Sequence, residues 1–368
     1  MGRQGNGQRV LVVGGGIIGL AVSRQLARDG WDVTILERGR PAEEASWAAA
    51  GMLSPLGESE SGPFRALALD SHARYPEWTA AVEEESGHAV DLRPSGRLVL
   101  ARSSERAAAL RQECAVLSGE GHAVEWLSRP DARAHLSTLS EDIEGAAWHA
   151  LDAHVDNRKL GPALLRAAER AGVAVRCGSG VSHILMEGGR AAGVRLDSGD
   201  RLPGERVIVA AGAWSGMMDS PHPVPVRPVR GQMLALAPAA TPPEHPIVDS
   251  GDVYVIPRAG RMLVGATVEE AGFDRTLSPA NANRLRSGAV RALPGLAGAS
   301  VDEEWIGFRP GTPDGHPVLG WAPDVEGLLL ATGHYRNGIL LAPVTAALVA
   351  DLLAGHPAPL AQAFAPSS

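Results

Sequence analysis

Residues 10–19 read VLVVGGGIIG, and this stretch decides the fold. Residues 10–13 form a short apolar run, which is typical of a strand buried on both faces of a parallel sheet. A helical stripe begins at Leu20 after the glycines, and a second apolar run begins at Val33. The order of strand, glycine turn, helix and strand predicts that residues 10–40 form a mononucleotide-binding βαβ unit.

The glycines at residues 14–19 have the spacing G-x-G-x-x-G, and Glu37 ends the second predicted strand. Glycines at these positions allow a tight turn, close packing of the helix and the approach of a pyrophosphate to the helix N-terminus. A carboxylate at Glu37 would accept a hydrogen bond from a ribose hydroxyl and would repel a 2′-phosphate. The motif therefore predicts a dinucleotide other than NADP, and it leaves NAD and FAD open.

Composition excludes several other classes of protein. The chain has 368 residues, which predicts two or three folding units, and its formal charge of −8 disfavours a nucleic acid or an anionic membrane as partner. Two distant cysteines, Cys114 and Cys177, indicate neither a disulfide framework nor a cysteine metal site, and they suit a reducing cytosol. The polar, glycine-rich residues 1–10 do not resemble a signal peptide, and the longest uncharged apolar runs fall short of the ~18 residues that span a bilayer. We expect a soluble, cytoplasmic protein.

The rest of the chain predicts an α/β protein in which a Rossmann-like domain is interleaved with an α+β domain built on an antiparallel sheet. An antiparallel meander is expected from residues 181–186, 193–196 and 207–210. A proline-rich passage over residues 221–246 then leads into a different unit. The other expected strands are 97–100, 173–176, 232–237, 253–256, 262–265 and 328–331, and the expected helices are 105–118, 159–171 and one that carries Val344, Leu348 and Leu352.

Two segments are candidates for backbone contacts with a flavin ring. Residues 45–52 belong to a stretch of small residues with an irregular pattern, so they form a loop or helix start suited to close approach. Residues 333–338 precede the last long helix, whose positive N-terminal end could lie at the flavin N1 and C2 carbonyl, where negative charge appears on reduction. The alternative is an ordinary helix start capped by Asn337.

Several motifs together resemble the D-amino-acid oxidase family of FAD-dependent amine oxidoreductases, in particular its glycine oxidase branch of the thiamine pathway. The resemblance runs from residue 9 to about residue 355, and its C-terminal motifs are specific to the amine-oxidising branch. The motifs are residues 14–19, AGML at 50–53, AGAWS at 211–215, YVIPR at 254–258, RPGTPDG at 309–315 and GHYRNGILLAP at 333–343.

The resemblance implies an FAD bound without a covalent link, because no cysteine beyond Cys177 is present for the attachment expected in a sarcosine oxidase. It implies an FAD-binding domain over residues 1–80, 151–220 and 306–368, and a substrate-binding domain over residues 81–150 and 221–305. The expected cofactor-binding residues are Gly14, Gly16, Ile17, Ile18, Gly19, Glu37, Arg38, Ala45, Ser46, Ala50, Gly51, Met52, Val181, His334, Tyr335, Arg336, Asn337, Gly338, Ile339 and Leu340.

Three residues are the expected catalytic set. By resemblance Arg309 clamps the substrate carboxylate, for which a planar guanidinium is suited because it pairs bidentately. Tyr254 would donate a second hydrogen bond to the carboxylate, although without the family it would be interpreted as core packing. Arg336 is expected close to the flavin and the substrate amine. Asp249 and Trp47 depart from the family pattern, which leaves the preferred amine open.

The resulting hypothesis is the oxidative deamination of glycine or another small amine. A hydride passes from Cα to flavin N5, the imine hydrolyses to glyoxylate and ammonia, O2 reoxidises the flavin to give hydrogen peroxide, and the imine feeds thiazole synthesis. One alternative is an oxidase or dehydrogenase of the same fold that acts on D-amino acids or sarcosine. Another is a flavin accessory domain acting on tRNA, which the acidic charge disfavours. A third is a membrane-docked dehydrogenase, for which the sequence offers no amphipathic anchor.

Residues 149–156 contain two histidines and two aspartates, but we interpret them as a strand or loop edge before a helix rather than as metal ligands. The expected partners are therefore a small amino acid and O2, with no metal, nucleic acid or membrane. Assembly into a homo-oligomer is left open.

Overall fold

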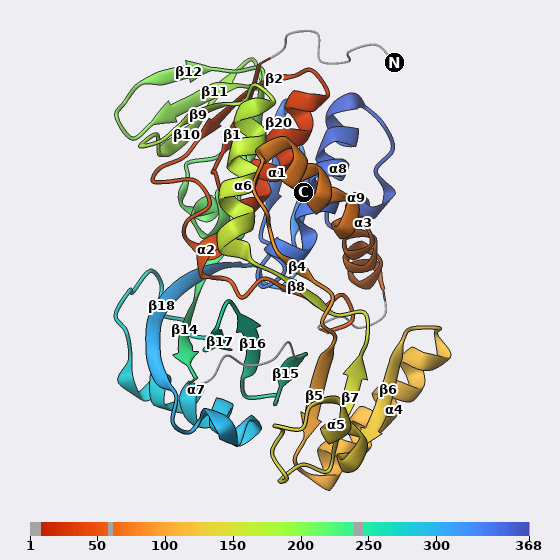
Figure 1. The fold of residues 1–368 in the computed structure, drawn as a ribbon. Helices are drawn as coiled ribbons and strands as arrows, with labels where there is room; N and C mark the ends of the chain where they lie inside the picture. Colours follow the sequence, from red (N-terminus) through yellow and green to blue (C-terminus); the bar gives the residue numbers. More distant parts are fainter. Residues whose placement is uncertain (1–8, 58–61, 239–245, 368) are drawn as a thin grey trace.

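The computed structural model describes residues 9–57, 62–238 and 246–367, so the expectation for residues 1–8 and part of the proline-rich passage lie outside the described residues. Its first layer is a six-stranded sheet in the order β19-β20-β13-β1-β2-β9, parallel except for β19 (Figure 1). The strands are β1 (Arg9–Val13), β2 (Asp32–Leu36), β9 (Ala174–Arg176), β13 (Arg206–Val209), β19 (Val318–Trp321) and β20 (Leu328–Thr332).

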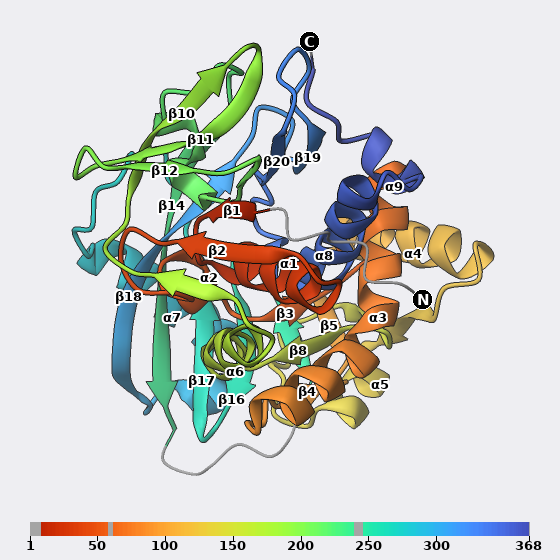
Figure 2. The same cartoon turned by 90° about the horizontal axis from the view of Figure 1, so that it is seen from above.

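Both faces of this sheet are buried, as the continuous apolar runs predict. Val10 and Val12 pack with α1 (Ile17–Arg28), α3 (Pro63–Ser86), α6 (Asn157–Arg170) and α8 (Gly338–Ala354) in one core cluster. Leu11 and Val13 point to the opposite face and pack with a three-stranded sheet made of β10 (Val181–Glu187), β11 (Arg190–Leu196) and β12 (Arg201–Pro203). Figure 2 shows this small sheet and α8 on opposite sides of β1.

The predicted meander is wrong in its third strand. The antiparallel sheet consists of β10 (Val181–Glu187), β11 (Arg190–Leu196) and β12 (Arg201–Pro203). Residues 207–209 instead belong to β13, which lies parallel to β1 and β20 in the large sheet. The physical reason is that Val207 and Ile208 belong to different core clusters, and a strand that is apolar on both faces is buried in a parallel sheet.

The second layer is an eight-stranded sheet in the order β18-β14-β17-β16-β15-β5-β7-β6, which lies in the lower half of Figure 1. The expected antiparallel sheet is confirmed except at β15 and β5, which run parallel. The strands are β5 (Arg97–Ala101), β6 (Val124–Ser128), β7 (Gly145–His149), β14 (Arg227–Ala237), β15 (Ile247–Asp249), β16 (Tyr254–Arg258), β17 (Arg261–Gly265) and β18 (Ser300–Gly311). Helices α4 (Ser104–Gly119), α5 (Arg129–His135) and α7 (Pro279–Ala292) pack against it.

Short elements connect the two layers. A small sheet joins β3 (Met52–Leu53), β8 (Ala153–Val155) and β4 (Leu92–Arg93), and α2 (Ala45–Ala48) precedes it. The stretch at 149–156 forms the end of β7, then β8 and the approach to α6, as predicted. The remaining elements are η1 (Gly212–Met217), η2 (Pro294–Leu296) and α9 (Pro359–Gln362).

The predicted domain limits do not all coincide with element ends. Residue 80 lies inside α3 and residue 306 lies inside β18, which pairs with β14 along the eight-stranded sheet. The chain crosses repeatedly between the two large sheets, so the interleaved arrangement of the prediction is seen in the strand orders. In the part of the chain that the structure describes, no helix has both the length and the apolar character needed to cross a membrane.

Candidate functional site

A pocket of about 680 Å³ lies between the two large sheets. It begins at the carboxyl ends of β1, β2, β13 and β20, where ligands of open α/β sheets bind. It continues past α2 and the start of α8 onto the face of the eight-stranded sheet. Its volume is within the range of roughly 300–1,000 Å³ that is usual for cofactor sites.

The glycine turn between β1 and α1 has the close packing that the motif predicts. Gly14 has φ +106°, and a Cβ there would overlap the Ala210 carbonyl, while a Cβ on Gly19 would overlap the Gly14 carbonyl. Glu37 holds this turn, because its Oε2 accepts a hydrogen bond of 2.7 Å from the Gly15 N–H. The first turn of α1 faces the pocket, where the Ser46 hydroxyl accepts a 2.9 Å hydrogen bond from the Ile17 N–H, and a helix N-terminus of this kind suits a pyrophosphate.

An aromatic residue that the sequence reasoning did not assign to the site borders this end of the pocket. The Arg38 guanidinium lies 3.6 Å from the ring centroid of Trp214, and it donates a 3.0 Å hydrogen bond to Glu44. Trp214 also stacks on Phe273. Trp214 belongs to the AGAWS motif of the sequence, but only the fold shows that Trp214 contacts Arg38 at the carboxyl end of β2.

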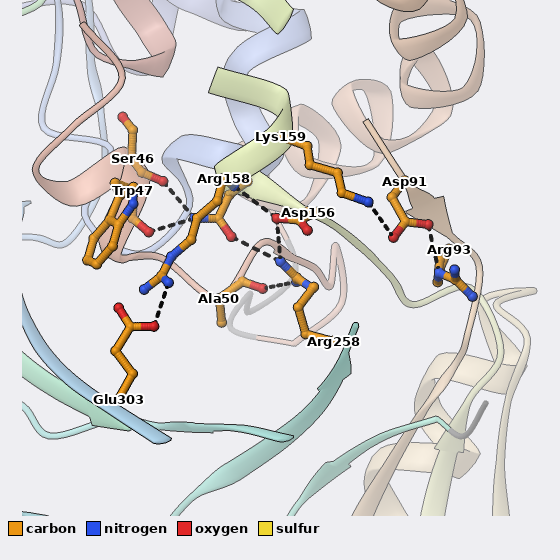
Figure 3. A network of polar contacts seen from close by, with 11 residues as sticks. Ser46, Trp47, Ala50, Asp91, Arg93, Asp156, Arg158, Lys159, Arg258 and Glu303 are labelled. Carbon is orange, nitrogen blue, oxygen red and sulfur yellow. Dashed lines mark hydrogen bonds and ion pairs between the residues drawn. The ribbon is translucent and has the colours of Figure 1, made fainter. Parts of the chain in front are cut away.

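Residues 46–50 follow the pocket wall, and side chains from distant elements bind their backbone carbonyls (Figure 3). Asn157 Nδ2 donates to the carbonyls of Ser46, at 2.8 Å, and Trp47, at 2.9 Å. Trp305 Nε1 donates to Ala48, at 2.9 Å. In the segment that we expect beside the flavin, three consecutive carbonyls thus each accept a hydrogen bond from a side chain of a distant element.

Arg258 completes this set of contacts. Its Nη2 donates to the Ala50 carbonyl at 2.8 Å, and its Nη1 pairs with Asp156 Oδ1 at 3.1 Å (Figure 3). The side chains of Arg258 and Asp156 are 5% and 10% exposed, so the ion pair is buried. Gly51 follows with φ +71°, and a Cβ there would overlap the Val155 carbonyl, so this position requires glycine.

Trp47, one of the two departures from the family pattern, lies outside the lining of the pocket. Its ring packs edge-on against Trp305, and the Arg158 guanidinium lies 3.6 Å above it. Trp47 therefore does not border the substrate space directly, and the preferred amine stays open. Asp249, the other departure, does line the pocket.

The N-terminus of α8 meets the pocket at Gly338 and Ile339. Asn337 occupies the N-cap position, but its side chain makes no capping hydrogen bond, so the alternative of an ordinary capped start is not supported. His334 is buried, its Nε2 lies 3.0 Å from Thr345 Oγ1, and burial lowers the pKa of its imidazole to about 3. The imidazole is therefore neutral, and the positive charge at this point comes from the helix end.

The floor beyond α8 is the face of the eight-stranded sheet. The register pairs Val99 with Asp249, Asp249 with Tyr254, and Tyr254 with Gly265. Paired residues of neighbouring strands point to the same face, and these four all line the pocket. Together they form the floor of the pocket.

Two glycines leave room above this floor. A Cβ on Gly265 would overlap the Tyr254 ring, and a Cβ on Gly231 would overlap the Arg309 guanidinium, so both side chains lie across glycine positions. Arg309 Nη1 donates to the Thr267 carbonyl at 3.0 Å, which fixes the guanidinium. Arg309 from β18 and Tyr254 from β16 thereby reach the same pocket from different strands.

The structure brings most of the predicted site residues together. The pocket lining includes Gly16, Ile17, Ile18, Glu37, Arg38, Ala45, Ser46, Ala50, Gly51, Met52, Tyr254, Arg309, His334, Tyr335, Arg336, Asn337, Gly338 and Ile339. Gly14, Gly19, Val181 and Leu340 are outside it. The two glycines serve the turn, Val181 begins β10, and the Leu340 carbonyl accepts a hydrogen bond from Ser71 Oγ at 2.6 Å. The sequence reasoning missed Met233, Gly231 and Gly265, which no local motif distinguishes.

These residues fit an FAD. The glycine turn and α1 offer a place for a pyrophosphate, Glu37 lies where the ribose is expected, and the end of α8 suits a ring that gains negative charge. Among the described residues, no three histidine, cysteine, aspartate or glutamate side chains lie together as a metal site.

The six-stranded and eight-stranded sheets share one pocket, and the N-termini of α1 and α8 both face it. Fold and site together define a flavin-dependent oxidoreductase. The chain belongs to the DAO family, described as "FAD dependent oxidoreductase", which matches residues 9–352. It is an enzyme that uses FAD.

Several relatives carry more specific names. The chain is 38% identical over 94% of its length to a "Bifunctional protein ThiO/ThiG" of Nostoc sp., and it covers 52% of that protein. It is 35% identical to a "Glycine oxidase" of Pseudomonas aeruginosa, with 97% of this chain and 99% of the relative covered. The crystal structure of glycine oxidase from Geobacillus kaustophilus superposes with a TM-score of 0.92 at 34% identity, covering 98% of this chain and 99% of that one. The chain spans about half the length of the bifunctional relatives it matches.

Proposed function

We propose that the protein oxidises glycine to glyoxylate and ammonia, with O2 as electron acceptor and hydrogen peroxide as the second product. Its likeness to glycine oxidases over nearly the full length of both chains supports this proposal. The single observation that carries it is the placement of the Arg309 guanidinium across Gly231 in a pocket that also contains Tyr254. This placement offers a carboxylate-binding group beside the flavin region.

The roles of the chain's residues follow from their positions. Arg309 binds the substrate carboxylate, for which a planar guanidinium is suited because it pairs at two points, and its contact with the Thr267 carbonyl orients it. The Tyr254 hydroxyl donates to the same carboxylate from the opposite side of the floor. Fixing the carboxylate at two places orients Cα, and such positioning supplies much of the rate of a reaction of this kind.

When bound at the residues described above, FAD would supply an acceptor for the hydride of the substrate Cα that O2 can reoxidise. The chain prepares the site for the charge that this produces. The N-terminus of α8 lies at the pocket, and a helix end of that sign stabilises negative charge. Arg336 lies beside it, with its guanidinium carbon 5.0 Å from the Tyr335 ring centroid, and adds a positive charge.

We further infer that the imine product feeds thiamine thiazole synthesis in the cytoplasm. Likeness to the ThiO/ThiG proteins supports the first part of this proposal. An acidic chain with two cysteines supports the second.

The test is anaerobic addition of glycine to the purified yellow protein. We expect bleaching of the flavin absorbance, and one equivalent of peroxide per glycine oxidised once air is admitted. Comparison with sarcosine, D-alanine and D-proline identifies the preferred amine. Turnover only with an artificial acceptor would overturn the assignment as an oxidase, and preference for another amine would overturn glycine.

The role of Arg309 has its own test. Arg309→Ala should raise KM for glycine by at least about 100-fold, since a charged hydrogen-bonded pair is lost, while FAD remains bound. Arg309→Lys keeps the charge but not the two-point contact, so it should recover part of the loss. Loss of FAD from Arg309→Ala would instead show that Arg309 supports the fold.

A further inference from the structure

Asp249 lies on the pocket floor directly beside the residue proposed to bind substrate. It pairs with Tyr254 across β15 and β16, and with Val99 across β15 and β5, so its side chain points to the same face as theirs. Neighbouring strands are about 4.8 Å apart. The Asp249 carboxylate therefore borders the space that a substituent on the substrate would enter beyond Tyr254.

The position of this carboxylate is fixed by two contacts. Its Oδ2 accepts a 2.9 Å hydrogen bond from Arg97 Nη1, and its Oδ1 accepts a 2.9 Å hydrogen bond from the Gly251 N–H. Arg97 is itself almost fully buried on β5, and it lines the same pocket. The carboxylate is thus a permanent part of the floor rather than a side chain that swings into solvent.

Arg97, Asp152 and Asp249 form one ion-pair group that has more negative than positive charge. Arg97 Nε already forms a 2.6 Å ion pair with Asp152, whose side chain is fully buried behind it. One guanidinium therefore faces two carboxylates, and the group of three carries a net charge of −1. Asp249 is the most exposed of the three side chains, at 24%, and of the two carboxylates it is the one that lines the pocket.

We propose that Asp249 is a specificity-determining residue that admits amino acids with an uncharged substituent and excludes those with a second carboxylate. The inference rests on the proposed function, because it takes the substrate carboxylate to lie at Arg309 and Tyr254. A second carboxylate would approach the net negative charge at a distance of one or two strand spacings. In the partly dry pocket that repulsion lowers affinity by about tenfold or more. Specificity of this kind comes from a repulsive group rather than from a better contact.

The experiment uses two unreactive ligands of the same shape, succinate and its monoamide succinamate, with the FAD-loaded protein. Dissociation constants are measured from changes in the flavin absorbance. We expect the parent protein to bind succinamate at least about tenfold more tightly than succinate. In Asp249→Asn, whose amide can still contact Arg97, we expect this ratio to fall towards one.

A matched control separates the local effect from net charge. Asp252→Asn removes a carboxylate at the pocket rim that is 74% exposed and paired with Arg291, so the ratio should change by less than about twofold. Asp249→Ser serves as a second variant if Asp249→Asn does not retain FAD. The proposal is overturned if the parent binds both ligands equally, if it fails to bind succinamate, or if the ratio survives in both variants. Because no turnover is involved, these results are independent of whether glycine is the substrate, which peroxide formation tests.

Discussion

Removal of the Arg258 guanidinium should destabilise the protein through residues 46–50, the segment expected beside the flavin. Arg258→Met keeps a long apolar side chain in place but deletes the donors to the Ala50 carbonyl and to Asp156. Both lost partners are buried, so water cannot replace the guanidinium fully. The change therefore acts at one point that joins β16, the start of α6 and residues 46–50.

The magnitude follows from the contacts that survive. Breaking a buried ion pair by removing one partner costs about 3–5 kcal/mol. Asp156 keeps a 3.1 Å hydrogen bond from the Arg158 N–H at the start of α6, where the helix end favours a negative charge. We therefore expect the lower value, about 3 kcal/mol. With an unfolding entropy of roughly 2 cal/mol/K per residue, this lowers Tm by about 4 °C.

Thermal unfolding of the FAD-loaded protein, followed by circular dichroism, measures the loss. Adding Asp156→Asn to Arg258→Met should recover roughly half of it, because the amide caps the helix equally well and leaves no uncompensated charge. The control is Arg261→Met on the same hairpin, which loses more exposed pairs with Asp302 and Glu303 worth about 0–1 kcal/mol. A Tm for Arg258→Met within 1 °C of the parent, or a further loss on adding Asp156→Asn, would refute the reasoning.

Three other predictions concern pH and the cofactor. Burial lowers the pKa of His149 and of His154 from 6.5 to about 4, so both imidazoles gain protons on unfolding below pH 6.5. The free energy of unfolding therefore falls as the pH drops from about 6.5 towards 4. Urea titrations at several pH values should show a shallower fall for His149→Gln than for the parent. Glu37→Gln loses a charged acceptor for the Gly15 N–H and should weaken FAD binding about tenfold, as titration of the apoprotein would measure. Gly51→Ala introduces a Cβ at φ +71° against a carbonyl, so it should be purified with little flavin, and a full flavin content would contradict this.

Local patterns predicted the nucleotide-binding half well, because its determinants are close in sequence. The apolar run at residues 10–13, the glycines that follow and Glu37 lie within one βαβ unit. The segment 333–338 was recognisable for the same reason, since it leads directly into α8, which begins at Gly338. Where the chain itself supplies strand, turn and helix in order, the spacing of glycines is enough to place a phosphate site.

The substrate face could not be predicted in this way, because it depends on register between distant strands. Asp249 meets Val99, which is far away in sequence, and Tyr254 lies across Gly265 on another strand. Apolar strands that alternate with turns are compatible with several strand orders, as the wrong assignment of residues 207–209 shows. Only the assembled sheet reveals that Asp249 is part of the floor and that Trp47 is not part of the pocket.

The spacing within the motif YVIPR has a physical explanation in the assembled fold. Tyr254 and Arg258 are four residues apart on β16, so their side chains point to the same face, about 13 Å from one another along the strand. One borders the substrate space, and the other holds the Ala50 carbonyl of the segment expected beside the flavin. An insertion or deletion of one residue between them would turn one of these side chains to the opposite face. The strand therefore acts as a rigid spacer between the Tyr254 hydroxyl, the proposed donor to the substrate, and the backbone segment expected beside the flavin, which neither residue could do from a loop.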